Sequence, residues 1–137
     1  MRAIVNIAND SSGKPVSIRK ISEAEKISAE FLEQICFRLK KAGIVRSVRG
    51  PGGGFLLARA PKAISMYDVF KAVGEGSQIA SCVSSCEKEA ADCRRKYKCA
   101  VHPTWNKLSR EVAQLLSDYT IKTIMDDTPV GRTPARL

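Results

Sequence analysis

The chain has 137 residues, 44% of them hydrophobic, and a formal net charge of +9 at pH 7. This length suits one small domain with an extension, and the apolar content is sufficient for a hydrophobic core. The excess of Lys and Arg favours an anionic partner such as nucleic acid, and no apolar run approaches the roughly 18–20 residues that span a bilayer. The first residues also lack the apolar segment and cleavage site of a signal peptide, so we expect a cytoplasmic protein.

The first half of the chain has the pattern of three short helices. Residues 3–8 carry apolar side chains at helical spacing. Ser17 is placed to cap a helix over residues 18–25, and Ser28 to cap another over residues 29–42, which Gly43 ends. The apolar side chains of the latter helix form one stripe, which contains Phe31, Leu32, Ile35, Cys36, Leu39 and Ala42.

A change of period after Gly43 predicts a β-hairpin. Residues 44–48 and 55–57 favour strands, and the glycine-rich run 50–54 between them excludes a helix. Two helices with a tight junction followed by a hairpin is the order of a winged helix-turn-helix. We therefore predict a mostly α-helical fold with a small β-hairpin wing, in which residues 1–74 form the DNA-binding domain.

The second half of the chain predicts a helix, a loop and a longer helix. Ser65 and Asp68 have the spacing of a capping box, and Gly74 ends the helix that it begins. We expect a cysteine-bearing loop over residues 75–102, a long helix over 103–125 and a disordered tail over 126–137. The long helix carries an apolar stripe that stays close to a heptad repeat and contains Trp105, Leu108, Val112, Leu115, Leu116 and Tyr119.

The outer face of helix 29–42 and the hairpin tip are the expected DNA-reading surface. In a helix-turn-helix the second helix enters the major groove, where Glu33 can accept a hydrogen bond from cytosine and Gln34 can pair with adenine. Basic side chains suit phosphate contacts, and a glycine tip lets the backbone approach the sugar–phosphate chain. A nucleotide phosphate loop is the alternative for this tip, but its Gly-Lys-Ser/Thr sequence is missing. The expected DNA-contacting residues are Ser28, Glu30, Glu33, Gln34, Arg38, Lys41, Arg49, Gly50, Pro51, Gly52 and Gly53.

Four of the five cysteines and the only histidine lie within 21 residues: Cys82, Cys86, Cys93, Cys99 and His102. Thiolates and imidazole are the ligands that hold zinc and iron–sulfur clusters. A reducing compartment and an odd cysteine count argue against a disulfide framework. The residues alone leave open an iron–sulfur site, a zinc site that staples the loop, and a reversible disulfide between Cys82 and Cys86. The fifth cysteine, Cys36, lies on an apolar stripe and is expected in the core.

Residues 27–35, 39–45 and 47–55 resemble the Rrf-two family of bacterial winged-helix regulators, and the resemblance covers about residues 1–126. The cysteine segment, in which Cys93-x5-Cys99-x2-His102 is followed by Trp105, resembles the iron–sulfur branch of that family, the IscR type. The resemblance implies a homodimer formed through the last long helix and a palindromic double-stranded DNA operator. It also implies a repressor of iron–sulfur cluster biogenesis genes whose operator affinity changes with cluster occupancy. It implies neither an enzyme, nor a membrane partner, nor a small-molecule substrate.

The resemblance implies the ligand set Cys82, Cys93, Cys99 and His102, with Cys86 as the alternative to Cys82. Both Cys82 and Cys86 stand further from Cys93 than the family spacing, but Cys82 has the family distance from the preceding helix. Three thiolates and an imidazole suit a 2Fe–2S cluster, whereas ligation by all four cysteines would favour 4Fe–4S. The chain begins within the family's first helix, so we expect that helix to be incomplete. A small iron–sulfur redox protein is the rival class, and it would leave the basic hairpin unexplained.

Overall fold

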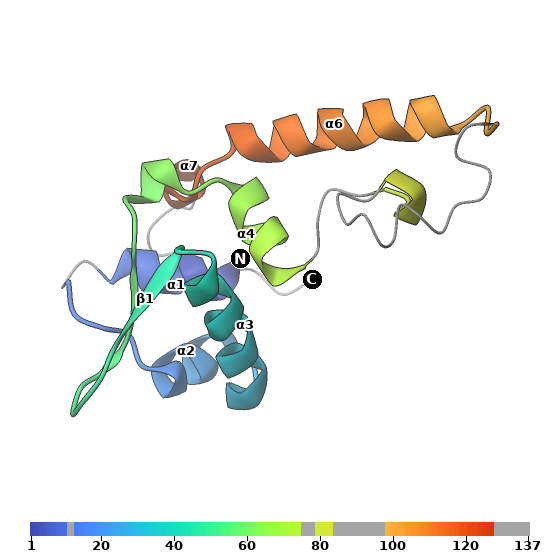
Figure 1. Cartoon of the computed structure of the whole chain (residues 1–137). Helices are drawn as coiled ribbons and strands as arrows, with labels where there is room; N and C mark the ends of the chain where they lie inside the picture. Colours follow the sequence, from blue (N-terminus) through green and yellow to red (C-terminus); the bar gives the residue numbers. More distant parts are fainter. Residues whose placement is uncertain (11–12, 75–78, 84–97, 128–137) are drawn as a thin grey trace.

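The computed structural model describes residues 1–10, 13–74, 79–83 and 98–127. These residues are mostly α-helical, with one two-stranded antiparallel hairpin (Figure 1). The elements are α1 (Arg2–Asn9), α2 (Ile18–Glu25), α3 (Ala29–Lys41), β1 (Val45–Val48), β2 (Gly54–Leu57), η1 (Pro61–Ala63), α4 (Met66–Val73), η2 (Ser81–Val83), α6 (His102–Asp118) and α7 (Ile121–Asp127). No helix within the described ranges has the length and apolar character needed to cross a membrane.

Serine caps begin both α2 and α3, as the sequence predicts. The Ser17 hydroxyl accepts a hydrogen bond from the backbone N–H of Lys20 at 3.2 Å, and the Ser28 hydroxyl accepts one from Phe31 at 3.3 Å. Between the two helices Lys26 adopts a left-handed conformation, with φ of 56°. This single residue reverses the chain, so α3 begins within four residues of the end of α2.

The predicted hairpin is present and is joined by a third segment. β1 and β2 pair with Val45 opposite Leu57 and Val48 opposite Gly54. Val16 exchanges two backbone hydrogen bonds of 2.9 Å with Phe55, which fixes the turn-proximal part of β2 to the segment before α2. A Cβ atom at Gly54 would lie 2.3 Å from the Val16 carbonyl oxygen, so this close approach requires glycine.

The core collects buried side chains from α1, α2, α3, the hairpin, α4 and α7. Its fully buried members include Ile4, Ile21, Leu32, Leu39, Ile44, Ile64 and Ile121. Two residues of the predicted α3 stripe differ from expectation: Phe31 is 54% exposed, and Ala42 is exposed beyond the end of the helix. Phe31 lies at the edge of the stripe, because the arc that α3 buries is centred on Leu32, Cys36 and Leu39.

The start of α4 has the predicted capping box. The Ser65 backbone N–H donates to the Asp68 carboxylate at 3.1 Å, and the Asp68 N–H donates to the Ser65 hydroxyl at 3.1 Å. Gly74, with φ of 86°, ends the helix. The order of two helices, hairpin and capped helix is therefore confirmed.

The long helix predicted over 103–125 is two helices in the structure. α6 ends at Asp118, and α7 begins at Ile121. The break lets the Tyr119 carbonyl accept from Met66 N–H at 2.8 Å and lets Ile121 N–H donate to the Ile64 carbonyl at 2.9 Å. Full burial of Ile121 in the core stabilises this turn. Residues 126 and 127, predicted in the tail, belong to α7, and residues 128–137 lie outside the described part.

Candidate nucleic-acid interface and cysteine segment

The polar side of α3 faces away from the core. All of the α3 residues predicted to contact DNA are exposed, together with the residue that caps the helix: Ser28, Glu30, Glu33, Gln34, Arg38 and Lys41. Positions 30, 34, 37 and 41 recur at spacings of four and three residues, so they share one face of the helix. This face lies opposite the buried Leu32, Cys36 and Leu39.

The predicted set omits one large side chain on that face, Phe37. It is 69% exposed, the highest value among the large apolar residues that the structure describes. The signal is present in the sequence, because position 37 lies between Gln34 and Lys41 at helical spacing. An exposed aromatic side chain therefore interrupts an otherwise polar face.

Two basic side chains of α3 make contacts within the domain. The Arg38 guanidinium donates to the Val73 carbonyl at 2.6 Å, which ties α3 to the last residue of α4. The Lys40 ammonium donates to the Ser47 hydroxyl at 2.8 Å, which ties α3 to β1. Contact of Arg38 with DNA phosphate stays a prediction.

The hairpin tip projects from the domain at the lower left of Figure 1. Gly50 and Gly52 have φ values of 102° and 76°, and the Gly53 N–H donates to the Gly50 carbonyl at 2.8 Å to close the turn. Arg46 and Arg49 are both exposed beside this turn. Cationic side chains thus flank a tip whose backbone is almost bare, which is a geometry suited to a phosphate chain.

The predicted metal ligands lie partly outside the described residues. Cys82 lies in η2 and Cys99 in the turn before α6, and both are free and half-buried. Cys86 and Cys93 fall in the range that the structure does not describe. Within the described ranges no three His, Cys, Asp or Glu side chains come together as a metal-binding group.

His102 has the surroundings of a ligand. It is the first residue of α6, and its backbone N–H donates to the Cys99 carbonyl at 3.3 Å. Its Nε2 atom is buried and has no hydrogen-bond partner among the described residues. A buried imidazole nitrogen without a partner is costly, and it is a preferred donor to a metal. Imidazole and thiolate are both ligands of iron–sulfur clusters, and Cys99 stands three residues before His102 in the chain.

Cys36 is separate from this segment. Its side chain is fully buried among the α3 contacts to the core, and burial raises the pKa of its thiol from 9.0 to about 11. It is therefore a core residue, as predicted, and a poor nucleophile at neutral pH.

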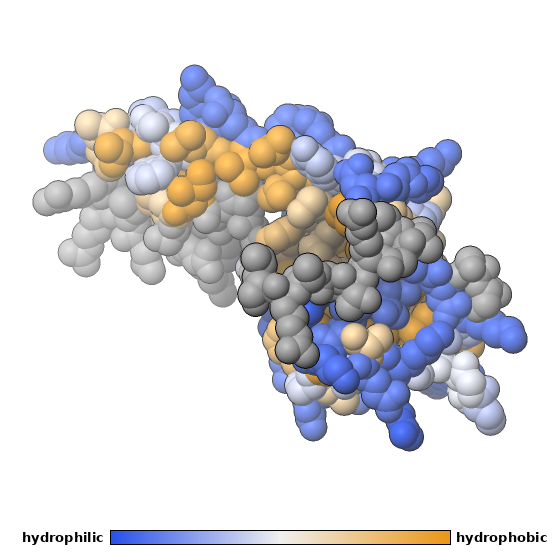
Figure 2. Space-filling view, turned by 180° about the vertical axis from the view of Figure 1, so that it is seen from behind, coloured by the Kyte–Doolittle hydropathy of each residue, from blue (hydrophilic) through white to orange (hydrophobic). Residues whose placement is uncertain are grey.

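An apolar stripe runs along α6 and the residues that flank it. Its members alternate at spacings of four and three residues: Val101, Trp105, Leu108, Val112, Leu115 and Tyr119, of which Trp105 and Val112 are half-buried and the others exposed. Leu116, predicted in this stripe, is half-buried and falls outside that spacing. Leu115 is 58% exposed. Figure 2 shows apolar surface running along the arm that α6 forms away from the domain. Alternation of this kind is the heptad repeat of helices that pair.

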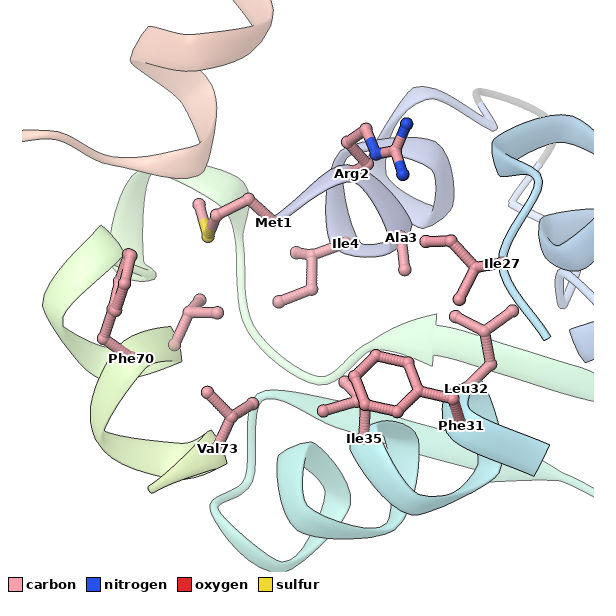
Figure 3. A pocket seen from close by; sticks show the side chains of 11 residues that line it. Met1, Arg2, Ala3, Ile4, Ile27, Phe31, Leu32, Ile35, Phe70 and Val73 are labelled. Carbon is pink, nitrogen blue, oxygen red and sulfur yellow. The ribbon is translucent and has the colours of Figure 1, made fainter. Parts of the chain in front are cut away.

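A pocket of about 280 Å³ lies between α1, α3 and α4 (Figure 3). Its lining consists of Met1, Arg2, Ala3, Ile4, Ile27, Phe31, Leu32, Ile35, Val69, Phe70 and Val73. Among these described residues Arg2 alone has a charged side chain, so the lining lacks the converging polar side chains of a reaction site.

The helix-turn-helix with its hairpin defines a winged-helix DNA-binding fold. The Rrf2 family, described as an iron-dependent transcriptional regulator, matches residues 1–127, and the chain belongs to this family. The predicted Rrf-two resemblance and the predicted fold class are thereby confirmed, and the chain is a transcriptional regulator of the winged-helix type.

Individual relatives agree with this assignment. The HTH-type transcriptional regulator IscR of Vibrio atlanticus is 37% identical over 128 residues, which cover 93% of this chain and 71% of the relative. Among solved structures, T. potens IscR has a TM-score of 0.72 at 29% identity and covers 98% of this chain and 86% of that one. CymR, the global cysteine regulator of B. subtilis, has a TM-score of 0.69 at 25% identity, with coverage of 92% and 89%.

Proposed function

We propose that this chain is a cytoplasmic, homodimeric repressor of iron–sulfur cluster biogenesis genes that binds a palindromic double-stranded DNA operator. Its operator affinity depends on whether an iron–sulfur cluster, of the 2Fe–2S type, is bound. The iron-dependent description of the family and the IscR relatives support this function. The buried, unpartnered Nε2 of His102 beside Cys99 is the observation that carries it.

Cys82, Cys93, Cys99 and His102 would hold the cluster, with Cys86 as the alternative to Cys82. When bound, such a cluster supplies a group whose oxidation state and occupancy respond to oxidants and to iron supply. Residues 75–102 form this ligand segment in the proposal, and they connect the DNA-binding domain to α6, whose first residue is His102.

The described part of the ligand segment contacts α6, because the Ile79 backbone N–H donates to the Ser109 hydroxyl at 3.4 Å. Just before the segment, the Val73 carbonyl at the end of α4 accepts from Arg38 of α3. In this proposal a change of order in the segment acts on α6 directly and reaches α3 through the end of α4. Only a difference in DNA affinity between the two states produces regulation.

Metal analysis on anaerobically purified protein tests the ligand assignment. We expect a coloured protein that contains iron and acid-labile sulfide, and we expect Cys99→Ala and His102→Ala to lose both. Cys36→Ala is the matched control, because Cys36 is a core residue, and it should retain the cluster. A colourless protein that contains zinc would indicate a zinc-dependent regulator instead. A colourless, metal-free protein with a reversible Cys82–Cys86 disulfide would indicate a thiol regulator.

DNA binding is tested with duplexes selected from a random pool, using cluster-loaded and cluster-free protein. Unequal affinities for the selected duplexes support the proposal. Equal affinities would leave a DNA-binding regulator without cluster sensing. A coloured protein without DNA affinity would indicate a redox protein instead.

A further inference from the structure

Phe37 stands at the centre of the outward face of α3. Glu30 and Gln34 precede it on this face and Lys41 follows, and all of them are exposed. The neighbouring Cys36 is fully buried, so the helix cannot rotate to bury Phe37 without exposing its core stripe. The aromatic ring is therefore held in solvent by the packing of the opposite face.

The backbone under Phe37 is fixed on both sides. The Ser28 hydroxyl caps the start of α3. The next residue along the chain, Arg38, donates to the Val73 carbonyl at 2.6 Å, and Lys40 donates to Ser47 at 2.8 Å. A side chain on a helix anchored in this way is presented at a defined position, which is what recognition of one base requires.

A phenyl ring selects a different feature of DNA from its polar neighbours. It neither donates nor accepts a conventional hydrogen bond, whereas the major-groove edges of the bases present mainly donors and acceptors. The exception is the C5 methyl group of thymine, which is apolar and reaches into the groove. Contact between the phenyl ring and the thymine methyl group buries apolar surface of both groups.

We propose that Phe37 contacts a thymine methyl group in the major groove and so selects thymine at one position of each operator half-site. This inference rests on the DNA binding proposed above and extends it to a residue that determines specificity. The alternative is that Phe37 contacts another protein. It is disfavoured because Phe37 is isolated among Glu30, Gln34 and Lys41, whereas α6 carries the continuous apolar stripe.

The test replaces single thymines by deoxyuridine, which removes only the methyl group. Duplexes are first selected from a random pool by the wild-type full chain, and each thymine of the selected half-site is then replaced in turn. We expect one position at which replacement weakens wild-type binding about four-fold, the value of one buried methyl group. Phe37→Ala should bind the thymine and deoxyuridine duplexes equally at that position, and Phe37→Leu should keep part of the preference.

Phe31→Ala is the matched control, because it removes the same side chain from the same helix but at the rim of the apolar pocket. It should retain the wild-type preference for the methyl group. The inference is overturned if wild-type protein binds all deoxyuridine duplexes as tightly as the thymine duplex, or if Phe37→Ala keeps the preference. A change in self-association of Phe37→Ala without a change in methyl preference would also overturn it, in favour of a protein contact. Failure of the wild-type chain to bind any duplex would instead refute the proposed function itself.

Discussion

Arg38 and Val73 join the recognition helix to the end of α4 through one hydrogen bond of 2.6 Å from the guanidinium to the backbone carbonyl. The two residues are 35 positions apart in the chain. Gly74 follows at once, and a Cβ atom there would lie 3.7 Å from the Arg38 nitrogen. The last carbonyls of a helix lack partners within it, so Arg38 supplies a donor and a favourable positive charge at this helix end.

We expect Arg38→Ala to lower the free energy of unfolding by about 1 kcal/mol, because an exposed charge-assisted hydrogen bond is lost. Urea denaturation monitored by circular dichroism measures the change in the free energy of unfolding. Arg46→Ala on the hairpin is the control, and it should change the free energy by less than about 0.5 kcal/mol. Equal effects of the two substitutions would show that the Val73 contact contributes nothing.

Gly54→Ala should destabilise the protein far more than Gly52→Ala. A Cβ atom at Gly54 meets the Val16 backbone, which must separate from Phe55, and we expect a loss of about 3 kcal/mol in the free energy of unfolding. A Cβ atom at Gly52 has open space, so the cost is the left-handed strain of about 1 kcal/mol. Chemical denaturation of the two variants tests this order, and the reverse order would contradict the contact with Val16.

The loss of folding stability at alkaline pH should depend on Cys36. Its folded pKa of about 11 exceeds the ordinary value of 9.0, so the folded protein keeps a proton that the unfolded chain loses between these pH values. The contribution is complete below pH 9 and is lost as the pH rises through about 11, with a total of about 3 kcal/mol. Denaturation at pH 8 and pH 11 should show a smaller fall for Cys36→Ala than for wild type. Equal falls would mean that the thiol does not titrate with unfolding.

Arg49→Ala should weaken DNA binding and make the affinity less dependent on salt concentration. Loss of one phosphate contact reduces the slope of log affinity against log salt concentration by about 1. Fluorescence anisotropy with one duplex at several salt concentrations gives the slope. Lys107→Ala removes one charge from α6, where Lys107 lies 3.9 Å from Glu111, and it should leave the slope unchanged. An unchanged slope in Arg49→Ala would remove Arg49 from the interface.

Features decided by short-range chemistry were predictable from the sequence. The caps at Ser17, Ser28 and Ser65 depend on hydrogen bonds across three residues, and the hairpin depends on its own glycine-rich turn. The left-handed conformation of Lys26 is not predictable from local sequence, because it is unusual outside glycine.

Features decided by distant contacts were not predictable in this way. The break after Asp118 requires Tyr119 and Ile121 to find backbone partners beside Ser65. Periodicity alone continues the helix there, because it contains no information about the segment around Ser65 that supplies these partners. For the same reason the sequence shows that Arg38 is basic but does not predict its contact with Val73.

The apolar stripe of α6 leads to the last prediction, which concerns the proposed dimer. Leu115→Glu places a charge at an exposed position of the stripe, where burial against a second helix would leave it without water or a partner. We expect this variant to be monomeric in sedimentation equilibrium, with an unchanged circular dichroism spectrum. Ser117→Glu introduces the same residue two positions further on, off the stripe, and should remain dimeric. A dimeric Leu115→Glu would locate the dimer contact elsewhere, and a monomeric wild type would refute the homodimer.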